Sequence, residues 1–366
     1  MASLDCSVII PTYREAENLV VLIPRVAAAL ASANLQGEIV IVDDNSPDDT
    51  RAVCTRLAEH YPVRLLVREA ERGLSSAVVH GMRAAAGEAL VVMDADLSHP
   101  PESIPELVAA LHDRDVDFVI GSRYIPGGST AEDWGVLRWM NSKIATLLAW
   151  PLSSVGDPMA GFFALRRATF ASARQLDPIG YKIGLELIVK CRCRTVREVP
   201  IAFANRLHGT SKLSFTEQIN YLRHLKRLYE FRLGRVSRPL LFALVGSTGV
   251  VVDLGFFLLL ALVLPMELAR AGAIWIAMTW NFWLNRHLTF SEARRLSPLR
   301  QYLMFCLSCS LGAVVNWSVS VGLSSTFDLF AYPPWLAALC GILAGTVLNY
   351  LCSNYIVFRH RPQRVP

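Results

Sequence analysis

Hydrophobic and polar positions follow two different patterns along the chain, and the change falls near residue 238. Before it, short runs rich in β-branched residues are separated by stretches with helical spacing, which is typical of strands joined by crossover helices. Five runs predict strands, at residues 6–10, 38–43, 64–67, 89–94 and 117–121. Because these runs are almost continuously apolar, we expect a parallel sheet covered on both faces, that is, an α/β domain.

Long uncharged runs dominate the rest of the chain, at residues 240–264, 271–290, 302–325 and 335–358. Each is close to the roughly 20 residues that a helix needs to cross a bilayer. The pattern therefore predicts an all-α membrane domain of four transmembrane helices. We place the domain boundaries at residues 1–216 for the α/β domain, 217–238 for an amphipathic interface segment and 239–366 for the membrane domain.

The interface segment carries leucines at helical spacing with five cations between them. Two interpretations fit this pattern. The helix either lies on the bilayer with its cations toward lipid headgroups, or packs its apolar face on its own domain.

The membrane half also repeats itself. The first set of matching positions is Phe242, Gly249, Val251 and Asp253, which recur as Phe305, Gly312, Val314 and Asn316. The second set is Asn281, Phe282 and Phe290, which recur as Asn349, Tyr350 and Phe358. This spacing predicts two helix pairs built from one duplicated hairpin. Polar residues such as Asp253 and Asn281 are costly in lipid, so they should face the bundle interior, where hydrogen bonding between helices is the expected role.

Composition supports a membrane protein. The mean hydropathy is +0.35 and only 18% of residues are charged, with a net charge of +5. The basic residues cluster beside the apolar runs rather than in a stripe, which favours an anionic membrane surface and argues against nucleic acid as a partner. They occupy the connectors and the tail: Arg286, His287, Arg294, Arg295, Arg300, Arg359, Arg361 and Arg364. By the positive-inside rule, both termini and the α/β domain are expected to be cytoplasmic.

Cysteine usage and the start of the chain agree with that compartment. The eight cysteines show no paired zinc-ribbon spacing, so we expect reduced thiols. We also expect no cleavable signal peptide, because Pro11 already belongs to the first domain.

Polar clusters follow three of the predicted strands, at residues 11–17, 43–49 and 94–99. Ligands bind beyond the carboxyl ends of parallel strands, so these clusters predict one site. Its most informative residues are Asp94 and Asp96, which follow a buried run. Two carboxylates two apart can direct oxygen atoms toward one hard cation and a diphosphate, as Mg²⁺ or Mn²⁺ requires.

These residues resemble a known family. The chain is similar to family 2 glycosyltransferases of the dolichol-phosphate mannosyltransferase type that carry a GtrA-like membrane domain. The stretches that carry the resemblance are residues 11–19, 42–50, 94–102, 121–124, 205–206 and 209–212. It covers residues 5–235 and implies a GT-A (Rossmann-like) catalytic domain; the membrane part is a looser match.

The resemblance also implies roles for individual residues. The positions implied for the nucleoside are Pro11, Tyr13, Glu15, Val42 and Asp44. Asp96 and Ser98 correspond to metal-binding positions, with Asp94 and Ala95 beside the sugar and diphosphate. Many relatives carry Gln where this chain has Ser98, and a water could bridge the shorter hydroxyl to the cation.

Basic residues complete the implied site. Arg206 and Lys212 match a pair on a loop over the donor diphosphate, although without the resemblance they would be ordinary surface charges. Arg123, Arg138 and Ser142 match contacts to an acceptor phosphate, which suits an arginine fork. Arg138 beside Trp139 could equally anchor the domain at the interface.

The implied reaction is the transfer of mannose from GDP-mannose to a dolichyl or polyprenyl phosphate, which gives polyprenyl-phosphate-mannose and GDP. A phosphate monoester is largely dianionic near neutral pH, so we expect direct attack with inversion and no covalent glycosyl-enzyme. Asp96 and Arg123 are the expected catalytic residues. Asp157 is either a base or, as we prefer, an orienting carboxylate.

Three alternative functions share parts of this pattern. A processive polysaccharide synthase should carry a Gln-x-x-Arg-Trp motif, and Arg138-Trp139 lacks the glutamine. An enzyme that uses a UDP-sugar with a polyprenyl phosphate is a closer rival. A third hypothesis treats the membrane half as a translocase for lipid-linked sugar or as a scaffold. The sequence leaves the oligomeric state open.

Overall fold

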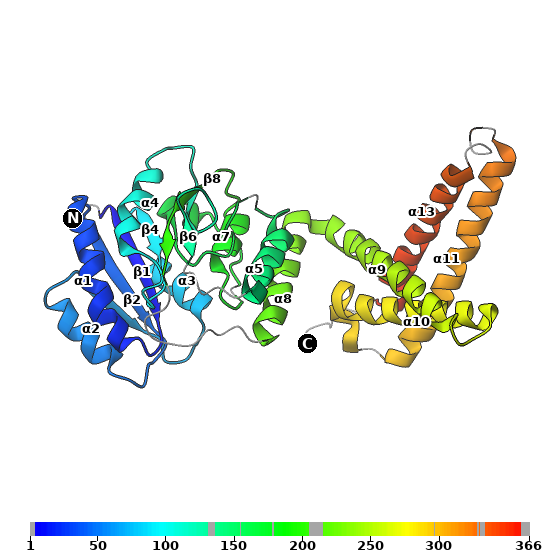
Figure 1. Cartoon of the computed structure of the whole chain (residues 1–366), viewed down its shortest axis with the longest axis horizontal. Coiled ribbons are helices and arrows are strands. Elements are labelled where there is room, and N and C mark those ends of the chain that lie inside the picture. The colour runs from blue at the N-terminus through cyan, green and yellow to red at the C-terminus, as the bar shows by residue number, and fades with distance from the viewer. Residues whose placement is uncertain are drawn as a thin grey trace, which may run out of the picture. The chain divides into compact units, whose positions relative to one another are not determined.

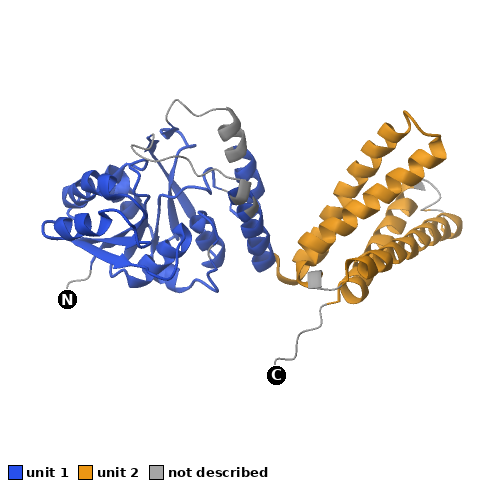
Figure 2. Ribbon diagram, turned by 90° about the horizontal axis from the view of Figure 1, so that it is seen from below, with its two compact units in different colours: residues 1–232 blue, residues 233–366 orange. Residues whose placement is uncertain are grey.

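The chain folds into two compact units, Met1–Arg232 and Leu233–Pro366 (Figure 2). The structure is a computed structural model. It describes residues 4–130, 136–153, 155–177, 179–204, 215–295, 297–327, 329 and 334–359.

Unit 1 is built on a seven-stranded sheet with the order β3-β2-β1-β4-β7-β5-β8 (Figure 1). The strands are β1 (Cys6–Thr12), β2 (Gly37–Asp43), β3 (Val63–Val67), β4 (Ala89–Val92), β5 (Phe118–Ser122), β7 (Phe163–Arg166) and β8 (Val196–Pro200). The five predicted strands are confirmed. The expectation of a parallel sheet is wrong in one respect, because β7 runs antiparallel to both β4 and β5. A returning strand can enter an open sheet wherever two neighbours leave their backbone groups unpaired.

Helices cover both faces of this sheet. One face carries α1 (Ala16–Ser32), α2 (Thr50–Ala58) and α4 (Ile104–Ala110), preceded by η1 (Pro101–Ser103). The other carries α3 (Leu74–Ala84) and α7 (Ile183–Lys190). The strands alternate accordingly, since Val8 and Ile10 pack in the first core and Ile9 in the second. The result is the three-layer α/β/α arrangement expected from strands that are apolar on both faces.

The remaining elements of unit 1 lie beyond β5. They are β6 (Ser129–Thr130) paired with β9 (Ala202–Phe203), α5 (Val136–Ala149), α6 (Arg167–Ala171) and α8 (Phe215–Leu233). The apolar side of α8 packs within unit 1, because Leu225 and Leu228 are buried against Leu152 and Leu185. Contact between α8 and a bilayer stays a prediction.

Unit 2 is helical. After η2 (Gly234–Val236) come α9 (Ser237–Leu260), α10 (Met266–Leu284), α11 (Pro298–Thr326) and α13 (Pro334–Cys352). The π-helical segments η3 (Asn285–Thr289) and η5 (Ser353–Val357) extend α10 and α13, and η4 (Ser291–Arg295) follows η3. Among the described residues, three helical stretches are long and apolar enough to span a membrane: Asn220–Leu260, which begins in α8 of unit 1, Pro298–Thr326 and Trp335–Val357. The helix α10 is not among them, so the fourth span stays a prediction.

The structure bears out the internal repeat of unit 2. In each half a glycine faces an asparagine of the paired helix: a Cβ added to Gly249 would lie 2.3 Å from Asn281 Nδ2, and one added to Gly312 would lie 2.2 Å from Asn349 Oδ1. The second helix of each pair also ends in a π-helical segment at the equivalent place. The two helices of each pair therefore pack in the same way: a glycine on the first helix lets an asparagine side chain of the second helix approach its backbone.

Candidate active site

The polar clusters after β1, β2 and β4 lie at one edge of the sheet, as predicted. The strand β1 pairs in parallel with β2 on one side and with β4 on the other. From β2 the chain continues to β3 on one side of the sheet, and from β4 it continues to β5 on the other side. Open α/β sheets bind ligands where the strand order reverses in this way. Pro11 and Val42 are register partners beside this edge, and both are buried.

Each of these three loops contains a residue in the left-handed region. The φ angles are 62° for Arg14, 55° for Asn45 and 62° for Leu97. Asparagine tolerates this conformation, but arginine and leucine adopt it at a cost in free energy. Such strain persists only where surrounding contacts impose it, and it concentrates at functional sites.

The loop after β2 is held by its own carboxylates. Asp43 is fully buried and accepts hydrogen bonds from Ser46 N (3.0 Å) and Ser46 Oγ (2.5 Å). Arg14 N donates to Ser46 Oγ (2.9 Å), which ties the β1 loop to the β2 loop. Asp44 accepts from Arg68 Nε and from Gly73 N, both at 2.7 Å. Asp44 is thus fixed in place by a buried ion pair, and its contact with a ribose stays a prediction.

Tyr13 lies between two cations. The guanidinium carbons of Arg14 and Arg72 each lie 5.3 Å from the centre of its ring, a cation–π geometry. Nearby, Glu15 accepts a hydrogen bond from Asn18 Nδ2 (2.6 Å). Arg72 was not singled out from the sequence, because it belongs to no motif and reaches Tyr13 only through the fold.

Asp94 and Asp96 follow β4 directly and differ in exposure. The side chain of Asp94 is 29% exposed, whereas Asp96 is 8% exposed. Asp96 Oδ1 accepts hydrogen bonds from Ser98 N (3.1 Å) and Ser98 Oγ (2.5 Å). Ala95 between them is buried. The Ser98 hydroxyl therefore orients Asp96, which adds a second role to its predicted one as a metal ligand.

The donor set fits a magnesium-type ion. Within the described residues, no group of three or more His, Cys, Asp or Glu side chains is gathered as a closed metal cage. Mg²⁺ is typically bound through one or two carboxylates, with substrate phosphates and water completing the shell. Asp94 and Asp96 offer that number of carboxylates at the rim, so the residues present suit a cation that arrives with a diphosphate.

His99 contacts the backbone of the loop that carries Asp94. Its Nδ1 accepts a hydrogen bond from Asp94 N (3.2 Å), and its ring stacks on Phe162 at 5.3 Å. Burial lowers the pKa of His99, although Asp94 and Asp96 act in the opposite direction. Gly161 passes so close that an added Cβ would lie 3.0 Å from Asp94 Oδ2. A neutral imidazole and a glycine together fix the Asp94 backbone and crowd its carboxylate.

Arg123 and Asp157 form a two-bond ion pair at the carboxyl end of β5. Arg123 Nε donates to Asp157 Oδ2 (2.6 Å) and Nη2 donates to Oδ1 (2.8 Å). The side chains are 11% and 1% exposed. Burial alone would lower the pKa of Arg123, but the hydrogen bonds and charge of Asp157 raise it above its usual value. Asp157 therefore orients a cation, which favours the second of its two predicted roles.

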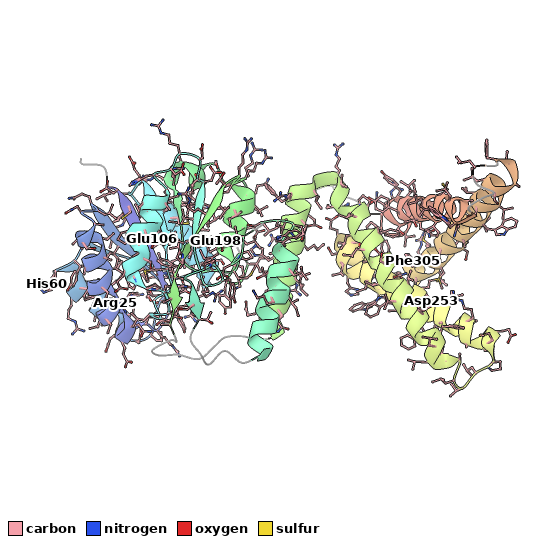
Figure 3. The ribbon with its side chains drawn as sticks, turned by 45° about the horizontal axis from the view of Figure 1, so that its top comes forward. Arg25, His60, Glu106, Glu198, Asp253 and Phe305 are labelled. Atoms are coloured by element: carbon pink, nitrogen blue, oxygen red, sulfur yellow. The ribbon has the colours of Figure 1, made fainter. Side chains whose placement is uncertain are left out.

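Further contacts hold this pair in place. Gly156 N (2.8 Å) and Asp157 N (3.2 Å) donate to the carboxylate of Glu198, on β8 (Figure 3). The centre of the Phe203 ring lies 4.9 Å from the Arg123 guanidinium carbon.

Like Arg72, Lys182 was not singled out from the sequence. It donates a hydrogen bond to Met159 O (3.3 Å). Burial and then the charge of Arg123 lower its pKa, while Asp157 and Asp94 raise it.

Four predicted site residues cannot be placed. Arg206 and Lys212 lie outside the described residues. Arg138 and Ser142 belong to α5, in the part of the helix whose side chains are not described. Their predicted contacts with donor and acceptor phosphates stay predictions.

Comparison with known proteins identifies the family of both parts of the chain. Residues 7–172 match Glycosyl transferase family 2, and residues 241–358 match the GtrA/DPMS transmembrane domain. The chain is 40% identical to the dolichol-phosphate mannosyltransferase of Pyrococcus furiosus, over 98% of this chain and 99% of the relative. It is 44% identical to the dolichol-phosphate mannosyltransferase of Mycosarcoma maydis, over 66% of this chain and 84% of the relative. Among solved structures, glucosyl-3-phosphoglycerate synthase from Mycobacterium tuberculosis gives a TM-score of 0.49 at 19% identity, covering 64% of this chain and 81% of that chain.

Proposed function

This chain belongs to the dolichol-phosphate mannosyltransferases, with a family 2 glycosyltransferase domain followed by a GtrA/DPMS transmembrane domain, and we propose that it transfers mannose from GDP-mannose to a dolichyl or polyprenyl phosphate. The observation that carries the proposal is the shared edge of the sheet. Asp94 and Asp96 follow β4 and the paired Arg123 follows β5, and the charge of Asp94 acts on Arg123, so acidic and basic groups stand near one another at this edge.

The acidic side of this edge suits the donor. Asp96 and Asp94, with Ser98 beside them, would hold Mg²⁺ or Mn²⁺, which when bound neutralises charge on a departing nucleoside diphosphate. Pro11, Val42 and Asp44 border the same edge and would receive the nucleoside. Ser98 would contribute by donating two hydrogen bonds to Oδ1 of Asp96, which fixes the orientation of the carboxylate.

The basic side suits the acceptor. A phosphate monoester is largely dianionic near neutral pH and needs orientation rather than deprotonation. Arg123 would orient it together with Arg138 and Ser142, and Asp157 keeps Arg123 in a single rotamer through two hydrogen bonds. This division predicts direct attack with inversion at the sugar carbon. Arg206 and Lys212 would stabilise the leaving diphosphate.

The reaction would take place on the cytoplasmic side of the membrane. The chain is a membrane protein by its GtrA/DPMS domain and its three apolar helical stretches. Basic residues lie before the first apolar stretch, in the connector at residues 286–300 and in the tail, and by the positive-inside rule this supports a cytoplasmic catalytic unit and cytoplasmic termini.

The test uses the purified full-length chain with a polyprenyl phosphate and a panel of GDP- and UDP-sugars, with and without Mn²⁺ or Mg²⁺. We expect GDP-mannose to be the preferred donor and chelation to abolish transfer. Asp96→Asn should reduce the rate at least about 100-fold, since it removes a charge at the diphosphate. Glu106→Gln is the matched control, because Glu106 is exposed on α4, outside the site (Figure 3).

Two outcomes would contradict the proposal. An Asp96→Asn enzyme that transfers sugar at the rate of Glu106→Gln would remove the catalytic role of the carboxylates. A UDP-sugar that outcompetes GDP-mannose would keep the chemistry but replace the donor.

A further inference from the structure

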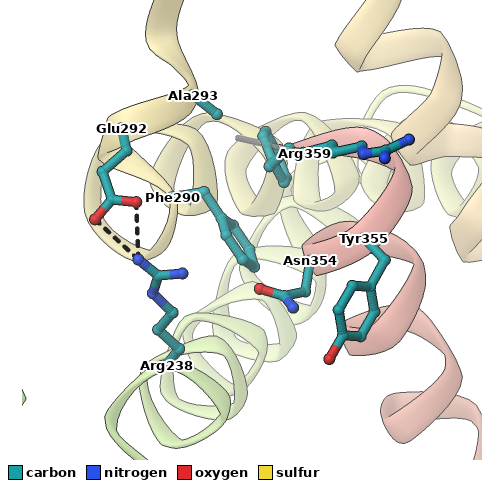
Figure 4. A pocket seen from close by; sticks show the side chains of 8 residues that line it. Arg238, Phe290, Glu292, Ala293, Asn354, Tyr355 and Arg359 are labelled. Atoms are coloured by element: carbon teal, nitrogen blue, oxygen red, sulfur yellow. Dashed lines mark hydrogen bonds and ion pairs between the residues drawn. The ribbon is translucent and has the colours of Figure 1, made fainter. Parts of the chain in front are cut away.

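Unit 2 contains a cavity whose lining residues all belong to unit 2. Its volume is about 270 Å³. It lies between the start of α9, the turn after η3 and the end of η5 (Figure 4). The side chains that line it are Arg238, Phe290, Glu292, Ala293, Asn354, Tyr355, Phe358 and Arg359. We propose that this cavity binds the phosphodiester headgroup of a membrane lipid.

The internal repeat shows that the cavity is not a general feature of this packing. Arg238 stands four residues before Phe242, and its repeat partner Gln301 stands four before Phe305. Likewise, Asn354 precedes Phe358 by four residues, and its repeat partner Arg286 precedes Phe290 by four. The repeat therefore creates two equivalent junctions, one between Gln301 and Arg286 and one between Arg238 and Asn354.

The first junction is closed. Gln301 is 2% exposed, its Oε1 accepts from Arg286 Nε (2.9 Å), and its Nε2 donates to the carbonyl oxygens of Ala293 (3.2 Å) and Val357 (3.4 Å). At the second junction the corresponding side chains border the cavity instead of filling it. The two junctions of the duplicated hairpin therefore differ: one is filled by hydrogen-bonded side chains, and the other leaves an open polar space.

The charges around the cavity select a monoanion. Arg238 Nη2 donates to both carboxylate oxygens of Glu292, at 2.8 Å each, so this pair is neutral together (Figure 4). Arg359 also lines this space and is exposed, so the described residues that line the cavity carry one positive charge in excess. A phosphodiester carries one negative charge, and arginine with an amide such as Asn354 supplies the donors that its oxygens accept.

The position of the cavity suits a headgroup. Arg238 is the second residue of α9, and Asn354 and Arg359 stand near or beyond the end of the apolar stretch Trp335–Val357. Charged residues at such ends lie at the depth of lipid headgroups. Phe290 and Phe358 stack at 4.7 Å and form an apolar wall. The volume lies just below the usual range for small-molecule sites, which fits a headgroup rather than a whole lipid.

The experiment measures lipid binding to the purified full-length chain by native mass spectrometry from detergent. The probes are phosphatidylglycerol, the lipid product of the chain's own reaction, polyprenyl phosphate, diacylglycerol and free glycerol phosphate. Arg359→Gln removes the excess charge, and Asn354→Asp places a negative charge in the cavity without changing its size. Arg300→Gln is the matched control, since Arg300 is exposed at the start of α11 and does not line the cavity.

We expect Arg359→Gln to weaken phosphodiester-lipid binding about tenfold and Asn354→Asp to weaken it further. Arg300→Gln should bind within about twofold of the wild type. Tighter binding of the product than of phosphatidylglycerol would assign the site to the glycosylated lipid, and the reverse order would assign it to bulk phospholipid. Equal affinities for all three variants, equal binding of diacylglycerol, or equal binding of free glycerol phosphate would overturn the proposal. Sugar-transfer rates of the same variants report separately on unit 1.

Discussion

At the candidate active site in unit 1, carboxylates are held by hydrogen-bond donors, whereas two asparagine side chains of unit 2 pack against the backbone of a glycine. Asp44 is paired with Arg68, Asp157 with Arg123, and Asp96 with Ser98. In the described part of unit 2, Asn281 Oδ1 and Asn349 Oδ1 are buried without a hydrogen-bond partner, each opposite a glycine. Unit 1 must hold charge ready for charged substrates, while unit 2 must avoid charge in lipid and gains packing instead.

The largest effect should come from breaking the Arg123–Asp157 pair. Arg123→Gln leaves a carboxylate that is 1% exposed without its cation, and such losses cost about 3–5 kcal/mol. The double variant Arg123→Gln/Asp157→Asn should recover most of that stability, because the orphaned charge is gone, yet sugar transfer should stay lost. Pulse proteolysis in detergent measures the stability of each variant. If the double variant is as unstable as Arg123→Gln, the charges are not coupled and the comparison fails for unit 1.

An intermediate effect should come from filling the glycine contact in unit 2. Gly249→Ala places a methyl group within 2.3–2.6 Å of the Asn281 carboxamide, and overpacking of this kind costs about 1–3 kcal/mol. Gly246→Ala is the control on the same helix, because a Cβ there meets nothing within 4 Å. It should be neutral or stabilising by up to about 1 kcal/mol. Thermal unfolding in detergent distinguishes the two, and equal midpoints would show that the glycine contact does not hold α9 to α10.

The smallest effect concerns His224, on the buried side of α8. It is 3% exposed, and its Nδ1 lies 3.2 Å from Ile179 O. Burial lowers the pKa of His224 below its usual 6.5, although Ile179 and Glu186 act in the opposite direction. Below about pH 6.5 the unfolded chain therefore binds a proton that the folded chain excludes. Burial of His224 therefore costs no stability above that pH, and the free energy of unfolding decreases as the pH falls below it.

His224→Gln should flatten this dependence by less than about 1 kcal/mol between pH 7.5 and 5.5. The measurement is the difference between variant and wild type in pulse proteolysis at both pH values, so that other titrating groups cancel. A wild-type chain that gains stability relative to His224→Gln on acidification would reverse the sign assigned here.

Local patterns in the sequence determined much of this protein. The runs that became β1, β2, β4 and β5 were readable because an apolar β-branched segment between turn residues favours a strand wherever it lies. The same holds for the apolar stretches of unit 2 and for its repeat. Asp94 and Asp96 could be located because the end of a strand fixes the edge to which they belong.

Only the tertiary structure decided which side chains meet. The antiparallel strand β7 enters between β4 and β5, and nothing in its four residues indicates that neighbour or that direction. The pairing of Arg123 with Asp157, the stacking of Arg72 on Tyr13 and the open junction between Arg238 and Asn354 also join residues distant in sequence. Periodicity reports which face of an element is buried, but contacts across elements depend on how the whole chain closes, and that information is not local.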